Sequence, residues 1–190
     1  MTSTFLTTHV MLDLETLGTA PGSVILTIGA VAFDPLAGEV TSSFSRAIRP
    51  ASAVAYGLRI DPDTVAWWTR QGAAAREAAF PEQADELPIA LQTFRFWLEQ
   101  WAPHHRRIWG HGATFDPVLL AEAYRACKLD TPWGHRDARD TRTLFDLAGI
   151  GKLDAYRREG DVEHDALADA RVQVRAVLDA YHRLNLGVAA

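Results

Sequence analysis

Cysteine is almost missing from the chain, which contains Cys127 as its single example. An internal disulfide is therefore excluded, and we expect a protein of the reducing cytoplasm. Long apolar runs are also missing, since none approaches the roughly 20 residues that a membrane helix needs. The N-terminus lacks a basic region followed by an apolar core, so we expect neither a membrane segment nor a secretory signal.

The chain also has no excess of basic residues. It contains 19 Lys and Arg against 24 Asp and Glu, which gives a net charge of −5. This balance argues against a broad basic surface that grips long duplex nucleic acid, but a short single strand held at its end is still allowed. The basic "HHRR" at 104–107 is expected to be a solvated loop. With 190 residues, 48% of them hydrophobic, we expect one domain over 1–190 with its core at about 8–184.

The first third of the chain reads as strands joined by short loops. "HVMLDL" (9–14), "SVILTIGAVAF" (23–33) and "EVTSSFSRAI" (39–48) are rich in apolar and β-branched residues, and turn signals separate them. This spacing predicts an antiparallel meander.

From Asp61 onward the pattern changes to helices alternating with short strands. Helical signals cover 61–72, 82–102, 116–128, part of 139–151 and a last helix after Asp165, and "RRIWG" at 106–110 reads as a strand. The order predicts an α/β fold in which helices pack on the faces of a mixed sheet.

Two acids interrupt the first strand. Asp13 and Glu15 are two residues apart, so both carboxylates point to the same face. A buried pair of like charges is unfavourable without a partner, and Mg²⁺ prefers such hard oxygen ligands. The alternative is an exposed strand end whose acids meet only solvent.

Three further residues lie where strands and helices meet. Asp116 follows "RRIWG" near a helix N-terminus, where it serves either as a helix cap or as a ligand. His164 and Asp169 are five residues apart and converge only if His164 precedes the helix and Asp169 lies in its first turn. Asp165 as N-cap predicts that arrangement, and the alternative is a loop histidine beside an acid favoured by the helix dipole.

Taken in order, "DLET", "ATFD" and "HDALAD" resemble the motifs of the DEDDh, or DnaQ-like, 3′–5′ exonucleases of the ribonuclease H-like superfamily. The resemblance covers about residues 8–182 and is closest to small bacterial exoribonucleases and phage exonuclease A. It implies a single exonuclease domain with a three-layer α/β/α fold and a mixed five-stranded sheet. One departure is "HGATFD", where many members have His-Asn, and this leaves a substrate role of His111 open.

The resemblance also implies a mechanism and its residues. Asp13, Glu15, Asp116 and Asp169 would hold two Mg²⁺ ions, with Asp13 bridging them and Mn²⁺ as a substitute. His164 would be the general base, since an unperturbed histidine pKa of about 6.5 suits proton transfer near neutral pH. Two bound divalent cations would bring the formal charge from −5 to about −1.

Substrate contacts are expected next to the first acids. The resemblance places Thr16, Leu17 and Gly18 beside the terminal nucleotide. Trp67 and Trp68 lie about 100° apart on a helix, so one is expected in the core and the other, for which Trp68 is the candidate, under a base. In "RDTRTL", Arg139 and Arg142 either contact phosphate or form a structural turn tied by Asp140.

The expected activity is release of nucleoside 5′-monophosphates from single-stranded RNA or DNA 3′ ends. The alternatives are an oligoribonuclease or tRNA-trimming enzyme, a hydrolase of another phosphoester, and a nuclease-fold binding module without activity. Because relatives in the subgroup are often dimers, we expect a homodimer.

Overall fold

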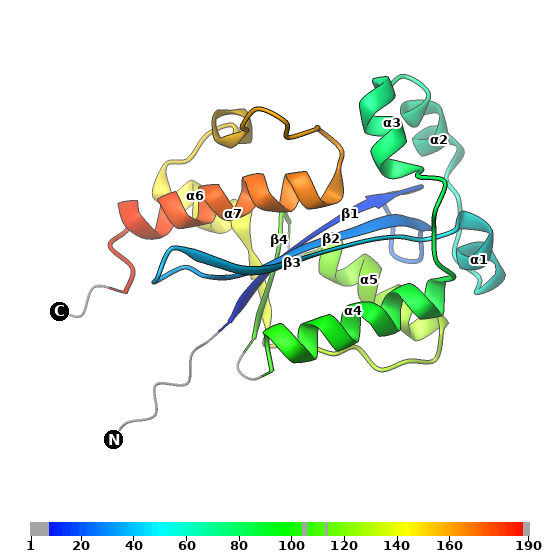
Figure 1. Ribbon diagram of the computed structural model, residues 1–190, viewed down its shortest axis with the longest axis horizontal. Helices are drawn as coiled ribbons and strands as arrows, with labels where there is room; N and C mark the ends of the chain where they lie inside the picture. The colour runs from blue at the N-terminus through cyan, green and yellow to red at the C-terminus, as the bar shows by residue number, and fades with distance from the viewer. Residues whose placement is uncertain (1–7, 104–105, 113, 188–190) are drawn as a thin grey trace.

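Five strands form a mixed sheet at the centre of the computed structural model, which describes residues 8–103, 106–112 and 114–187 (Figure 1). The strands are β1 (His9–Thr16), β2 (Ile25–Asp34), β3 (Glu39–Ala47), β4 (Arg107–Gly110) and β5 (Ala138–Asp140). Their order is β3-β2-β1-β4-β5. The first three pair antiparallel as the predicted meander, and β4 and β5 are parallel to β1.

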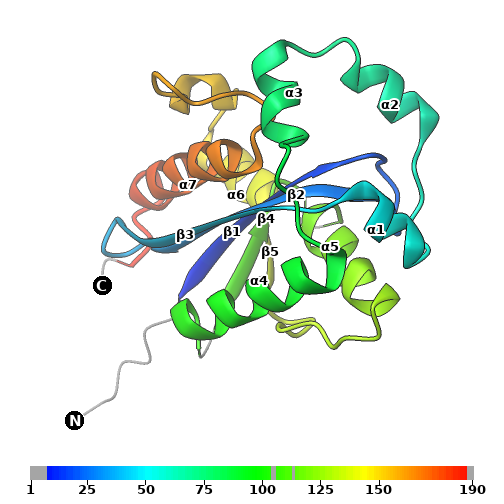
Figure 2. The same ribbon diagram turned by 45° about the vertical axis from the view of Figure 1, so that its right-hand side comes forward.

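Helices cover both faces of this sheet, which confirms the expected three-layer α/β/α fold (Figures 1 and 2). Helices α4 (Leu87–Trp101) and α5 (Asp116–Ala126) lie on one face, and α6 (Thr141–Ala148) and α7 (Ala166–Arg183) on the other. Three short helices gather near the end of β1: α1 (Pro50–Ala55), α2 (Pro62–Trp68) and α3 (Ala73–Ala79). A 3₁₀ turn, η1 (Leu153–Tyr156), precedes α7. Among the described helices, none has both the length and the apolar composition to cross a membrane.

The differences from the predicted elements concern short segments. Helices α1 and α3 and strand β5 were not individually expected, since each is too short to show a clear period. The predicted helix at 82–102 begins at Leu87, because Pro88 is favoured in a first turn. In the basic segment 104–107, His104 and His105 lie outside the described residues, and Arg107 begins β4.

Strand β1 alternates between the two cores, and this alternation positions the site. Val10, Leu12 and Leu14 belong to the apolar cluster under α4 and α5, whereas Met11 packs in the cluster under α6 and α7. Asp13 and Glu15 continue the Met11 series, so they face α7, as the two-residue period predicts.

A histidine at the opposite end of β1 makes the fold sensitive to acid. The indole Nε1 of Trp109 donates to Nδ1 of His9 at 3.0 Å, and the two rings stack. Burial lowers the pKa of His9 to about 4, and Arg107 adds to this effect while Asp34 opposes it. As the pH falls, the unfolded chain takes up a proton on His9 near pH 6.5, whereas the folded protein takes it up only near pH 4. The fold is therefore favoured most above pH 6.5, where His9 is neutral in both states.

We expect this stabilisation, about 3 kcal/mol, to be lost as the pH falls from 6.5 to about 4. Urea unfolding of wild type and His9→Gln across this range measures it, because glutamine still accepts from Trp109 but does not titrate. The variant should lose less stability than wild type on acidification. Parallel curves would show that other groups control the acid response.

Candidate active site

One cavity of about 480 Å³ collects all five side chains that the motifs predicted. They come from β1, from the start of α5 and from the segment that leads into α7, and they are Asp13, Glu15, Asp116, His164 and Asp169. Residues far apart in sequence therefore meet at the end of β1.

On β1, Glu15 is buried and Asp13 is half-buried, and the two acids share a surplus of negative charge. Burial raises the pKa of Glu15 to about 8, and the charges of Asp169 and Asp116 add to the rise. The pKa of Asp13 lies well above its usual range, first because of burial and then because of Asp116, Glu15 and Asp169. Such a cluster needs protons or cations to be stable.

Asp116 is the first residue of α5 but does not cap that helix. Its carboxylate oxygen Oδ1 instead accepts from the backbone N–H of Leu14 at 3.2 Å, which ties α5 to β1. The side chain is 3% exposed, and burial raises its pKa to about 7 despite that hydrogen bond. Of the two roles that the sequence left open, the geometry fits a ligand better than a cap.

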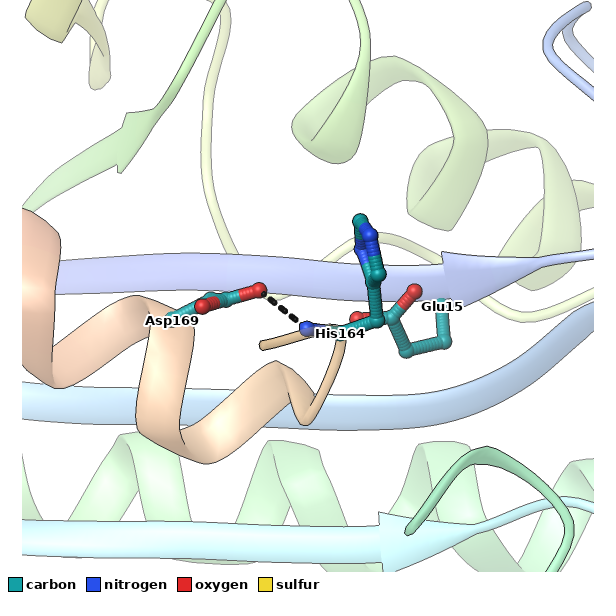
Figure 3. Close-up of side chains that lie close together, drawn as sticks. All are labelled: Glu15, His164 and Asp169. Carbon is teal, nitrogen blue, oxygen red and sulfur yellow. Dashed lines mark hydrogen bonds between the residues drawn. The ribbon is translucent and has the colours of Figure 1, made fainter. Parts of the chain in front are cut away.

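The start of α7 has the predicted arrangement. The side chain of Asp165 accepts from the backbone N–H groups of Leu167 and Ala168, so Asp165 is the N-cap and His164 precedes the helix. His164 has a left-handed backbone, φ 62°, which histidine adopts more readily than most residues. Its N–H donates to Oδ2 of Asp169 at 3.0 Å (Figure 3).

This turn brings a compact set of possible ligand atoms together. One such atom from each of Glu15, His164 and Asp169 lies within 4.8 Å of the others (Figure 3). Asp13 and Asp116 line the same cavity on the β1 side. Four carboxylates with raised pKa values and oxygen donors fit hard divalent cations such as Mg²⁺, and binding would replace protons.

Arg157 supplies a positive charge to the cluster from the segment after η1. Its Nη2 donates to Oδ1 of Asp169 at 2.7 Å, and this pair opposes the rise that burial causes in the pKa of Asp169. Nη1 of Arg157 is buried and has no hydrogen-bond partner among the described residues. Because Arg157 follows an irregular segment, no periodic pattern in the sequence pointed to it.

Gly29 on β2 allows the start of α7 to approach the sheet beside Asp13, with which it pairs. A Cβ at Gly29 would lie 2.2 Å from the carbonyl carbon of Ala166 and 2.4 Å from the nitrogen of Leu167. Both are backbone atoms, so a larger residue must displace the helix itself. Glycine is therefore required here by the same contact that positions His164 and Asp169.

Gly29→Ala is expected to destabilise the protein by about 1–3 kcal/mol, because overpacking moves the start of α7. The nuclease rate that the motifs lead us to expect should fall by about 10²-fold, since a displacement of about 1 Å is enough to misplace catalytic groups. Urea unfolding and a nuclease assay measure the two effects. Gly151→Ala is the matched control, because Gly151 is exposed, lies outside the helices and strands, and a Cβ there meets nothing within 4 Å. Equal behaviour of the two variants would contradict this role of Gly29.

A second pocket, of about 430 Å³, adjoins the acidic cavity and shares Leu14, Glu15 and Phe115 with it. Trp67 and Trp68 both line it. Trp68 is 3% exposed and its Nε1 donates to the carbonyl of Thr16, so it is the core member of the pair. The half-buried Trp67 lies edge-to-face against His164, and the structure favours it over Trp68 as a surface for a base.

The residues after Glu15 form the end of β1 and the bend that follows it. Thr16 lines the second pocket, whereas Leu17 is buried and bonds through its backbone to Val24 and Asp61. A Cβ at Gly18 would lie 2.4 Å from Oγ of Ser23, which explains the glycine by packing. Substrate contacts by these residues stay predictions.

Two of the remaining polar candidates face the acidic cavity. Arg142 lines it, whereas Arg139 donates to the carbonyls of Arg136 and Ala138. His111 also lines the cavity, with its Nδ1 2.9 Å from Oγ1 of Thr141. The carboxylate of Asp140 caps α6, as the structural alternative for "RDTRTL" predicts.

Comparison with known proteins gives the same assignment as the motifs. A family model described as the 3′-5′ exoribonuclease Rv2179c-like domain matches residues 8–181. An exodeoxyribonuclease of Enterobacteria phage T4 is 23% identical over 188 residues, which cover 84% of this chain and 82% of that protein.

Solved structures share the fold at low sequence identity. The nuclease domain of 3′hExo, a DEDDh family member bound to rAMP, aligns with a TM-score of 0.66 and 13% identity, over 97% of this chain and 94% of that chain. Zinc-bound E. coli exonuclease I in complex with single-stranded DNA aligns with a TM-score of 0.68 and 17% identity, over 95% of this chain and 41% of that one. The chain belongs to the 3′-5′ exoribonuclease Rv2179c-like domain family and is a 3′–5′ exonuclease with the ribonuclease H-like fold of the DEDDh nucleases.

Proposed function

We propose that the protein removes nucleotides from the 3′ end of single-stranded RNA and releases nucleoside 5′-monophosphates with the help of two divalent cations. The observation that carries this proposal is the gathering of four carboxylates and His164 around one cavity, beside a pocket lined by tryptophan. The family description favours RNA. The name of the phage relative makes DNA the second candidate.

The acids are proposed to hold the cations, Mg²⁺ in the cell and Mn²⁺ as a substitute. Asp13, Glu15, Asp116 and Asp169 supply hard oxygen donors, and the raised pKa values show how poorly the cluster tolerates its charge alone. When bound, divalent cations here would lower the pKa of water and neutralise the developing charge on the phosphate.

His164 is proposed to take the proton from the attacking water. Its backbone is fixed by the hydrogen bond to Asp169, and its ring is held against Trp67. The backbone and the ring of His164 are thus each held by one contact, and the ring lies in the acidic cavity against Trp67, which lines the second pocket. This position suits a base that acts on the last phosphodiester.

The terminal nucleotide is proposed to occupy the second pocket. Trp67 offers a ring for base stacking, worth about 1–3 kcal/mol, and Thr16 lines the same pocket. Arg142, which lines the acidic cavity, is the candidate for a phosphate contact. We also propose that the protein is cytoplasmic and forms a homodimer. Light scattering, which gives the molar mass in solution, tests the dimer.

Digestion of short, 5′-labelled single strands of RNA and DNA with one sequence tests the proposed function. Each strand is incubated with Mg²⁺, with Mn²⁺ or with EDTA, and the products are separated by length. We expect a ladder that shortens from the 3′ end, faster for RNA, and no reaction in EDTA. Internal cleavage or activity in EDTA would contradict the mechanism, and no product with either cation would favour a binding module.

A further inference from the structure

Gln173 lies in the acidic cavity although no motif includes it. It follows Asp169 by four residues, about one turn of α7, so the two side chains share a face of the helix. The side chain is 4% exposed, in a helix whose other buried residues are apolar or alanine. A buried glutamine at such a position needs a reason.

The carboxamide of Gln173 makes one hydrogen bond and leaves another unmade. Its Nε2 donates to Oδ1 of Asp13 at 2.6 Å. Its Oε1 is buried and has no hydrogen-bond partner within the described part of the chain. A buried acceptor without a partner destabilises a fold, and an apolar side chain of similar size would avoid this loss. The contact with Asp13 is therefore what the glutamine provides.

Asp13 is the acid that most needs such a contact. It lies among Glu15, Asp116 and Asp169, whose charges all act on it. A lysine or arginine in this place would hold the carboxylate but would also repel a cation. A neutral amide donor fixes the carboxylate and adds no positive charge.

We propose that Gln173 is a positioning residue of the divalent-cation site, which holds the Asp13 carboxylate in its cation-binding orientation at the expense of its own buried carbonyl. The inference rests on the proposed function, because it assumes that Asp13 binds a cation. Groups that orient ligands in this way change cation affinity by about 10–100-fold when they are removed.

Gln173→Leu and Gln173→Met test the proposal by two measurements that need no substrate. Thermal unfolding in EDTA should give a midpoint near that of wild type, because removal of the unpaired carbonyl offsets the loss of the hydrogen bond to Asp13. Calorimetric titration with Mn²⁺ alone should show affinity about 10–100-fold weaker than wild type. Gln92→Leu, at an exposed position of α4, is the matched control and should leave Mn²⁺ affinity unchanged.

The outcomes separate this inference from the proposed function. Wild-type Mn²⁺ affinity in both apolar variants would overturn the role of Gln173 and leave the proposed function standing. Loss of cooperative unfolding in both variants in EDTA would also overturn it, because the glutamine would then be required for the fold itself. Failure of the wild-type protein to bind Mn²⁺ would instead remove the proposed function itself.

Discussion

Asp13→Asn should lower the exonuclease rate by about 10³-fold or more while making the cation-free protein more stable. The rate falls because cations in such sites contribute several kcal/mol to the transition state, and each 1.36 kcal/mol is tenfold. The stability rises because the pKa of Asp13 is raised in the folded protein by burial and by Asp116, Glu15 and Asp169. Its ionised form therefore opposes folding above the pKa of the unfolded chain.

The sign of this second effect makes the experiment informative. In EDTA, the stability advantage of Asp13→Asn over wild type should grow as the pH rises, because wild type must then ionise an acid whose pKa is raised in the folded protein. Thermal unfolding across the neutral range measures it, alongside nuclease rates in Mg²⁺. Asp146→Asn, at an exposed position of α6, should change neither quantity. A variant that stays active, or that is destabilised at high pH, would argue against a cation at Asp13.

His164→Asn should reduce kcat by about 10²–10⁴-fold, the usual contribution of a general base. Asparagine is the suitable replacement because it tolerates the left-handed backbone at this position, whereas alanine adds strain. Its N–H can still donate to Asp169, so the start of α7 should be preserved. Circular dichroism and single-turnover rates in Mg²⁺ test the effect.

A cation titration of the same variant distinguishes a base from a ligand. A ring nitrogen of His164 lies close to the oxygens of Glu15 and Asp169, as a cation ligand would also do. If His164 is the base, Mn²⁺ affinity stays near wild type while the rate falls. A folded His164→Asn or His164→Ala protein with near wild-type rates would remove the histidine from the mechanism.

Local patterns were sufficient to predict how each motif lies on its own element. The two-residue period of β1 places Asp13 and Glu15 on one face, and the Asp165 cap places His164 before the helix. Both depend on neighbouring residues in the sequence, so no knowledge of the tertiary structure was needed. The family resemblance then supplied the order in which these elements meet.

The remaining parts of the site depend on contacts across the fold. Gly29 resembles any small strand residue until the backbone of Ala166 is placed against it. Gln173 shows a weak signal, a polar residue one turn after Asp169 on the buried face, but its partner is 160 residues away. Which of Trp67 and Trp68 lies in the core likewise depends on a contact across the fold, because Trp68 donates its indole N–H to the carbonyl of Thr16.

The docking of α7 across β1 and β2 also determines when the enzyme becomes active during its synthesis. A growing chain that has completed β1 to α6 already contains Asp13, Glu15 and Asp116, but it lacks His164 and Asp169. Since domains form as their segments leave the ribosome, we expect the five side chains to meet in one cavity only after α7 has been made and has packed on the sheet.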